Sequence, residues 1–209
     1  FEIEGIDGPI TSKPVIHNNI LVFGAWDTHL YAYDVIAKKL LWKWNNGSKV
    51  INFSPAACIP VIKDGVVYIA APDRYLTAID LHSGKTLWRT KEATVRESIG
   101  LSEDGKYVYG KTMQDTVAAF YTGADSPQLA WKMHVGYGYE HTPSMLIEKD
   151  GKLVFGTKNG IVYSVNRDEQ KINWAYKIDN SMVNTINVLN GKEIIASTMD
   201  GKISLLNTD

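Results

Sequence analysis

The residues best suited to bind a small molecule lie at similar junctions along the chain rather than in one motif. The junctions carry a carboxylate at Glu97, an imidazole at His141 and an amide at Asn184, and the guanidinium of Arg96 stands beside Glu97. A few convergent polar groups of different kinds are typical of a small-ligand site. We therefore predict a polar binding set of Ser54, Arg96, Glu97, His141 and Asn184.

The same junctions share a hydroxyl at one aligned place. The aligned hydroxyl residues are Ser12, Ser54, Ser98, Thr142 and Thr185. A hydroxyl that recurs at every junction is most simply a structural device that hydrogen-bonds to the backbone. Two interpretations stay open: the hydroxyls hold the junctions together, and the varying residues beside them bind a ligand.

A second polar set falls in predicted turns. Its members are Trp26, Asp73, Arg74 and Lys158. Turn residues are exposed and carry many binding functions, so these four are candidates for surface contact with a partner. Solvated turn chemistry is the alternative interpretation.

Signatures of common enzymes are missing from the sequence. It contains no Gly-x-Ser-x-Gly elbow, no Cys-x-x-Cys pair and no His-Glu-x-x-His zinc motif. Gly84-Lys85-Thr86 has no glycine at position 79, where a phosphate-binding loop requires one. We predict no catalytic residues and no metal site.

Charge and hydropathy limit the partners. The 22 basic and 23 acidic residues are scattered, so no basic block is available to neutralise phosphates, and nucleic acid is not an expected partner. No apolar run is long enough to span a bilayer. Because the sequence starts at Phe1 without Met or a signal segment, it is expected to be a mature or excised piece.

The elements that must position these residues form a repeat. Trp42, Trp88, Trp131 and Trp174 are separated by 46, 43 and 43 residues. Alternating apolar segments before each Trp predict a hairpin, and a fifth hairpin follows the last Trp. The predicted hairpins cover residues 21–33, 67–79, 107–120, 153–165 and 193–206. A further short extended segment before each hairpin and the Trp segment after it give four strands per unit.

A period of this length with strand content indicates a β-propeller, because single four-stranded sheets must stack face to face to bury both surfaces. We predict an all-β, single-domain propeller over 1–209 with about five four-stranded blades. The approximate blade units are 11–50, 51–96, 97–140, 141–183, and 184–209 together with 1–10. The segment Phe1–Ile6 is expected to supply the last strand and close the ring. The alternative is an arc of a larger propeller.

The residues Asp80-Leu81-His82-Ser83-Gly84-Lys85-Thr86-Leu87-Trp88 resemble the signature of the pyrroloquinoline-quinone-like propeller repeat. That family includes quinoprotein dehydrogenases, BamB-like outer-membrane assembly lipoproteins, and propellers attached to calcineurin-like phosphoesterases. Its dehydrogenases are larger and commonly carry an adjacent cysteine pair and calcium, whereas this chain has only Cys58. Pyrroloquinoline quinone is therefore not an expected cofactor, and no other cofactor is predicted.

The resemblance implies a bacterial, periplasmic or cell-surface propeller. We expect a non-catalytic scaffold that presents one face to a protein partner or companion domain. One alternative is binding of a small polar ligand such as a sugar at the mouth of the axial channel. Another is an accessory role in a larger bacterial hydrolase or phosphoesterase.

Overall fold

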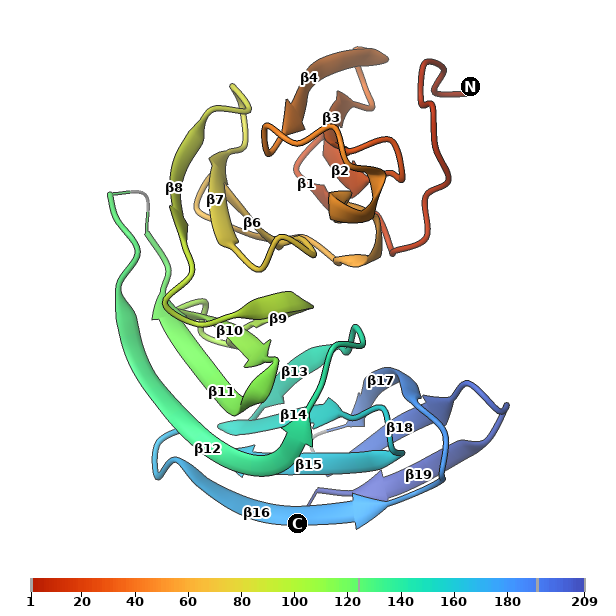
Figure 1. Cartoon of the computed structure of the whole chain (residues 1–209), viewed down its shortest axis with the longest axis vertical. Helices are drawn as coiled ribbons and strands as arrows, with labels where there is room; N and C mark the ends of the chain where they lie inside the picture. The colour runs from red at the N-terminus through yellow and green to blue at the C-terminus, as the bar shows by residue number, and fades with distance from the viewer. Residues whose placement is uncertain (1, 124, 191, 209) are drawn as a thin grey trace. The chain divides into compact units, whose positions relative to one another are not determined.

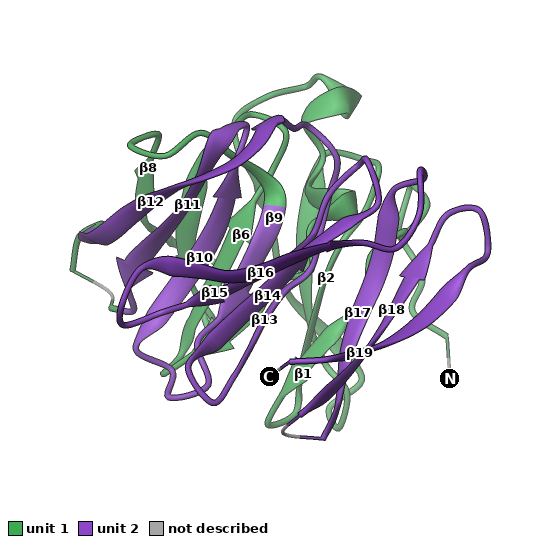
Figure 2. Cartoon of the chain, turned by 90° about the horizontal axis from the view of Figure 1, so that it is seen from below, with its two compact units in different colours: residues 1–97, 123–127 green, residues 98–122, 128–209 purple. Residues whose placement is uncertain are grey.

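The computed structural model describes residues 2–123, 125–190 and 192–208. It divides into two compact units, which are described separately (Figure 2). The first contains residues 1–97 and 123–127, and the second contains residues 98–122 and 128–209. The prediction of one domain stays a prediction.

The first unit contains two antiparallel four-stranded sheets, each with its strands in sequence order (Figure 1). The first sheet consists of β1 (Val15–His17), β2 (Ile20–Gly24), β3 (His29–Asp34) and β4 (Lys39–Asn45). Two short 3-10 helices follow, η1 (Ile51–Phe53) and η2 (Pro55–Ala57). The second sheet consists of β5 (Val61–Lys63), β6 (Val66–Ala70), β7 (Leu76–Asp80) and β8 (Thr86–Thr90).

The other three sheets are also antiparallel with their strands in sequence order, and the described part of the fifth has three strands instead of four. They lie in the second unit, apart from the start of β9. The third sheet consists of β9 (Val95–Leu101), β10 (Tyr107–Thr112), β11 (Gln114–Tyr121) and β12 (Leu129–Tyr139). The fourth consists of β13 (Leu146–Lys149), β14 (Lys152–Gly156), β15 (Ile161–Asn166) and β16 (Lys171–Lys177). The fifth consists of β17 (Val183–Asn190), β18 (Glu193–Thr198) and β19 (Ile203–Asn207).

Sheets of the second unit stack face to face, as the repeat predicts. One apolar cluster joins Tyr109 and Val117 of the third sheet to Leu153 and Phe155 of the fourth. A second cluster joins the opposite face of the fourth sheet, including Val162, to the fifth. The fourth sheet thereby buries apolar residues on both of its faces, which a lone sheet cannot do.

The periodic Trp residues occupy one recurring position. Each lies directly opposite a small residue of the preceding strand, and the register shifts next to it. The pairs are Trp42 with Ala32, Trp88 with Ala78, Trp131 with Ala119, and Trp174 with Ser164. A small residue leaves room for the indole ring, and the extra residue of a bulge re-aims the chain.

The indole N–H groups confirm the predicted packing role. Within the first unit, Trp42 Nε1 donates to the carbonyl of Leu81 at 2.8 Å, and Trp88 Nε1 donates to the carbonyl of Gly123 at 3.2 Å. Within the second unit, Trp174 Nε1 donates to the carbonyl of Thr208 at 3.4 Å. A buried indole requires such an acceptor.

The expected closing strand at the N-terminus requires correction. Residues 2–10 contain no strand, and the described part of the fifth sheet has only three strands. Ile3 and Ile6 pack instead against Phe23, Ala25 and Tyr31 of the first unit. The two isoleucines thus pack against apolar side chains without pairing as a strand. Phe1 lies outside the described residues.

Candidate functional site

The predicted site residue Ser54 serves the backbone of its own unit. Its side chain is fully buried, and its Oγ accepts the N–H of Thr28 at 2.9 Å. At the neighbouring junction, Thr11 Oγ1 donates to the carbonyl of Ala56 at 3.0 Å and accepts the indole N–H of Trp26 at 3.1 Å. Ser54 and the predicted contact residue Trp26 therefore make structural hydrogen bonds.

Glu97 is the most unusual of the predicted site residues. It has a backbone φ of +57°, a region that side-chain-bearing residues rarely adopt. Its carboxylate is buried, with Oε2 lying 3.4 Å from Nε of Arg96. Burial raises the pKa of Glu97, and the Arg96 charge opposes that effect. The side chains of these two sequence neighbours thus contact each other within the first unit.

The second carboxylate oxygen of Glu97 lacks a hydrogen bond. Oε1 is buried and has no partner among the residues that the structure describes. Buried polar atoms are nearly always paired, because an unmade hydrogen bond leaves the desolvation penalty uncompensated. This oxygen could accept a hydrogen bond from a hydroxyl, an amide or a water molecule.

The remaining members of the predicted set lie in the second unit. His141 and Asn184 are both exposed, and the ring of His141 lies 6.0 Å from that of Tyr139. These two residues belong to a different unit from Ser54, Arg96 and Glu97. A shared channel mouth lined by all five therefore stays a prediction.

The aligned hydroxyls of the second unit are partly structural. Ser98 Oγ accepts the N–H of Ser144 at 3.0 Å and donates to the carbonyl of Thr142 at 3.4 Å. The hydroxyl of Thr142 donates to Glu140, and Thr185 Oγ1 lies 2.8 Å from Ser197 Oγ. The hydroxyls thus bond both to backbone and to neighbouring side chains.

A buried ion pair is the feature that the sequence prediction missed. Lys111 and Glu140 have side chains that are each 1% exposed, with Lys111 Nζ lying 3.9 Å from Glu140 Oε2 and 3.0 Å from the carbonyl of Gly156. The Glu140 carboxylate also accepts the N–H of Lys158 at 2.9 and 3.1 Å. The sequence signal that pointed to this pair was Lys111, a charged residue within the largely apolar strand β10.

Burial also changes the acid–base behaviour of this pair. It lowers the pKa of Lys111 to about 8, although the nearby Glu140 carboxylate acts in the opposite direction. The predicted contact residue Lys158 contributes its backbone to Glu140 and donates its ammonium to the carbonyl of Tyr139 at 2.7 Å. The cluster is thus a cross-sheet junction in the second unit.

The predicted contact residues Asp73 and Arg74 behave differently from each other. Asp73 forms an ion pair with Arg89 and accepts Asn46 Nδ2 at 2.9 Å. The Arg89 guanidinium also lies 4.2 Å from the ring centre of Tyr75, within cation–π range. Arg74 is exposed at a φ of +70°. Asp73 therefore stabilises its hairpin, and Arg74 is available to solvent.

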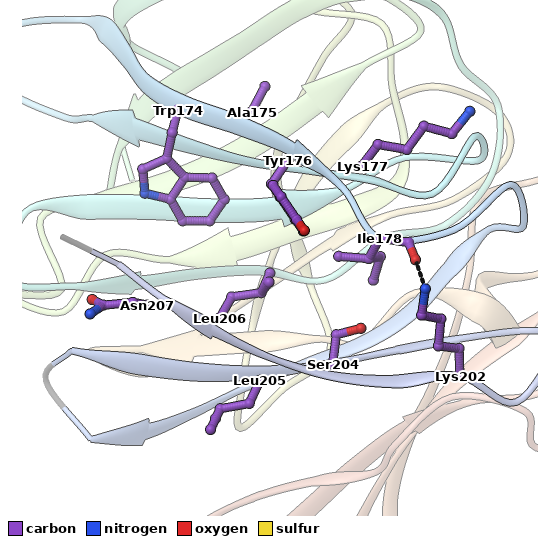
Figure 3. Close-up of a pocket in the computed structure, with 10 residues that line it drawn as sticks. All are labelled: Trp174, Ala175, Tyr176, Lys177, Ile178, Lys202, Ser204, Leu205, Leu206 and Asn207. Carbon is purple, nitrogen blue, oxygen red and sulfur yellow. Dashed lines mark hydrogen bonds between the residues drawn. The ribbon is translucent and has the colours of Figure 1, made fainter.

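A groove in the second unit lies between β16 and β19. It has a volume of about 660 Å³, and its lining residues are Trp174–Ile178, Lys202 and Ser204–Asn207. Trp174 and Tyr176 point from β16 toward Ser204 and Leu206 of β19, and Lys202 Nζ donates to the carbonyl of Ile178 (Figure 3). The groove combines aromatic and aliphatic walls with two lysines.

Solved structures establish the fold. BamB from Moraxella catarrhalis matches with a TM-score of 0.68 and 17% identity, covering 92% of this chain and 56% of that chain. The computationally designed protein Ika8 matches with a TM-score of 0.63 and 14% identity, covering 93% of this chain and 70% of that one. The chain therefore spans just over half the length of the Moraxella structure.

Sequence comparison adds the family. No curated protein sequence matches the chain. A family model described as outer membrane protein assembly factor BamB matches residues 4–126, which is more than half of the sequence. The repeat of Trp-bearing sheets and this match agree, and the chain belongs to the BamB-like family of β-propeller repeat proteins.

Proposed function

We propose that this chain is a non-catalytic scaffold that binds a protein partner through an ordered apolar loop. The loop covers residues 46–54 of the first unit. Val50, Ile51 and Phe53 are 51%, 59% and 39% exposed, and no residue of η1 is buried. Adjacent exposed apolar side chains are typical of a protein contact.

The backbone of this loop is held in place. The N–H of Phe53 donates to the carbonyl of Val50, and the N–H of Ser54 donates to that of Ile51, each at 2.9 Å. The amide of Asn45 accepts the N–H of Gly47 at 2.6 Å and donates to the carbonyl of Ser48 at 3.1 Å. A preformed loop loses less conformational entropy on binding, which favours recognition.

Family membership supports the class of partner. The matching family model is described as an outer membrane protein assembly factor, so we propose a protein of outer-membrane assembly as the partner and a periplasmic or cell-surface location. No helix in residues 2–123, 125–190 and 192–208 is long and apolar enough to cross a membrane. A role as a companion domain in a larger polypeptide is compatible with this proposal.

The test is binding of the purified chain to purified outer-membrane assembly proteins, measured by biolayer interferometry. The variant Ile51→Asp is expected to weaken binding at least tenfold, because a charge replaces an apolar contact. Ile36→Asp is the matched control, since Ile36 is 71% exposed in another turn. Equal binding by both variants, with unchanged melting temperatures, would remove the loop from the interface.

The orphaned oxygen of Glu97 favours a second candidate function, the binding of a small polar ligand. We propose a hydroxyl-rich ligand such as a sugar, with Arg96 as a second contact. A thermal-shift screen of polyols and sugars should raise the melting temperature of the wild type and leave that of Arg96→Ala unchanged. His141→Ala tests whether the second unit contributes. The absence of any shift in the wild type would eliminate this candidate.

A further inference from the structure

The apolar loop of the first unit, residues 46–54, adjoins a basic hairpin turn, and the two together indicate the charge of the partner. The turn covers residues 71–75 between β6 and β7, and Lys91 follows β8. We propose that the loop and this turn bind a protein segment in which carboxylates flank apolar side chains. This inference rests on the proposed binding of a protein through the loop, and it adds the chemistry of that partner.

Polar contacts join the loop to the turn. Asn46 Nδ2 donates to the carboxylate of Asp73 at 2.9 Å and to the carbonyl of Phe53 at 3.5 Å. All three residues belong to the first unit. The exposed side chains of the loop and those of the turn therefore lie next to each other within one compact unit.

The carboxylate of Asp73 is neutralised within the chain. It forms an ion pair with Arg89 and accepts the N–H of Tyr75 at 3.1 Å as well as the amide of Asn46. The side chain of Asp73 is only 13% exposed. Its negative charge therefore does not offset the exposed cations beside it.

Exposed cations without a carboxylate partner surround this network. Arg74 and Lys91 are both exposed, and Lys91 Nζ lies 4.3 Å from the ring centre of Tyr75. Neither cation forms an ion pair with any residue that the structure describes. Lys49 of the loop is exposed as well, and Glu92, next to Lys91, is an exposed carboxylate. Three cations and one carboxylate leave this surface with a net positive charge.

Arg74 occupies a backbone position that favours glycine. Its φ is +70°, and the equivalent turn of the fourth sheet has Gly160 at a φ of +74°. The two positions are equivalent because each stands two residues before the residue, Leu76 or Val162, that pairs with the end of the preceding strand. A side chain strains this conformation, so glycine would serve the turn better. The exposed guanidinium therefore favours a binding role over a structural one.

A surface with cations and apolar side chains can also contact an anionic membrane, but the features of this one favour a protein. Recognition of anionic lipid is typical of clusters of about four to eight Lys or Arg residues. This surface exposes Lys49, Arg74 and Lys91 and includes the carboxylate of Glu92. Its apolar side chains stand on a backbone fixed by hydrogen bonds, which suits a partner of defined shape. We therefore assign it to a protein segment.

The partner's side chains follow from this arrangement. Its apolar residues would pack on Ile51 and Phe53, which are 59% and 39% exposed. A carboxylate beside them would meet Arg74, whose planar guanidinium can donate two parallel hydrogen bonds to one carboxylate. Opposite charges across an interface raise the association rate and disfavour wrongly charged partners.

The probe is a fluorescein-labelled peptide, Glu-Leu-Glu-Phe-Asp-Leu-Glu, titrated with the full chain by fluorescence anisotropy. The control peptide is Lys-Leu-Lys-Phe-Lys-Leu-Lys. We expect saturable binding of the acidic peptide and at least fivefold weaker binding of the basic one. Ile51→Ser should weaken binding of the acidic peptide at least threefold, because it removes an apolar contact without adding charge.

Variants of Arg74 test the basic turn. Arg74→Glu should weaken binding of the acidic peptide at least fivefold. Lys85→Glu makes the same change of charge in the exposed turn between β7 and β8 and should leave binding unchanged. Arg74→Gly should also weaken binding, with a melting temperature no lower than that of the wild type, because glycine adopts this φ without strain. A purely structural arginine would instead lower the melting temperature when replaced.

The double variant Arg74→Glu with Lys91→Glu should reverse the preference, so that the basic peptide binds more tightly than the acidic one. A general loss of structure would not produce this reversal. The lipid alternative is tested by sedimentation of the wild type with phosphatidylglycerol vesicles, where we expect no binding that Arg74→Glu removes.

Three results would overturn the inference. The first is equal or absent binding of the two peptides by the folded wild type, and the second is wild-type affinity in Arg74→Glu and Arg74→Gly. The third is vesicle binding that depends on Arg74, which would assign the surface to a membrane. Against purified outer-membrane assembly proteins, loss of binding by Ile51→Asp but not by Arg74→Glu would leave the loop as the interface and remove only the acidic partner.

Discussion

The buried pair Lys111 and Glu140 should make the stability of the second unit depend on pH in the alkaline range. Lys111 Nζ has the Gly156 carbonyl at 3.0 Å and the Glu140 carboxylate at 3.9 Å as neighbours. Burial lowers the pKa of Lys111 from 10.5 to about 8. Between these values the folded chain binds fewer protons than the unfolded chain. The free energy of unfolding must therefore rise with pH through this window.

The magnitude follows from the width of the window. Each pH unit between the folded and unfolded pKa corresponds to about 1.4 kcal/mol, so the full contribution of Lys111 is about 3 kcal/mol. Tyr31 and Tyr137 have raised pKa values because of burial, and they decrease stability above about pH 10. Measurements from pH 7 to 9.5 avoid that effect, and about 2 kcal/mol of the Lys111 contribution falls within them.

The assay is urea unfolding of the wild type and of Lys111→Met, which retains the length of the side chain without its charge. The free energy of unfolding of the wild type minus that of the variant should increase by about 2 kcal/mol between pH 7 and 9.5. Glu140→Gln should be about 3 kcal/mol less stable than the wild type at pH 7, because it leaves a buried ammonium without its counter-charge. A difference between wild type and Lys111→Met that is independent of pH would refute the reasoning.

Three further predictions concern packing and reactivity. Gly100→Ala should decrease the free energy of unfolding, measured in urea, by about 2–3 kcal/mol, because a Cβ there would lie 2.1 Å from the carbonyl oxygen of Leu146. Gly123→Ala is the control and should be nearly neutral, because a Cβ at that position meets nothing within 4 Å. Trp42→Phe should decrease the free energy of unfolding by about 2 kcal/mol through loss of the bond to Leu81, and Trp26→Phe, at a half-buried site, by less than about 1 kcal/mol. Cys58 is buried, and burial raises the pKa of its thiol to about 12. The native chain should therefore react with a thiol reagent at pH 8 far more slowly than the urea-unfolded chain does. Equal reaction rates would contradict the burial of Cys58.

The sequence predicted the sheets because the repeat encodes them locally. Trp42, Trp88 and Trp174 mark the fourth strands. The alternation before each Trp predicts a hairpin, and the structure confirms these hairpins. A strand at the N-terminus was predicted from the same repeat spacing. For the residues that the structure describes, this prediction is wrong. Its isoleucines can bury themselves against any suitable apolar surface, and sequence periodicity does not say which.

The candidate site was less predictable than the sheets for a related physical reason. Alignment of the junctions identifies equivalent positions, but it does not give the burial of a side chain or the atoms that it bonds. Glu97 is buried with one orphaned oxygen, whereas the exposed His141 occupies the same place in its unit. Lys111 and Glu140 come from different parts of the third repeat, so their pairing depends on the turn of the chain between β12 and β13.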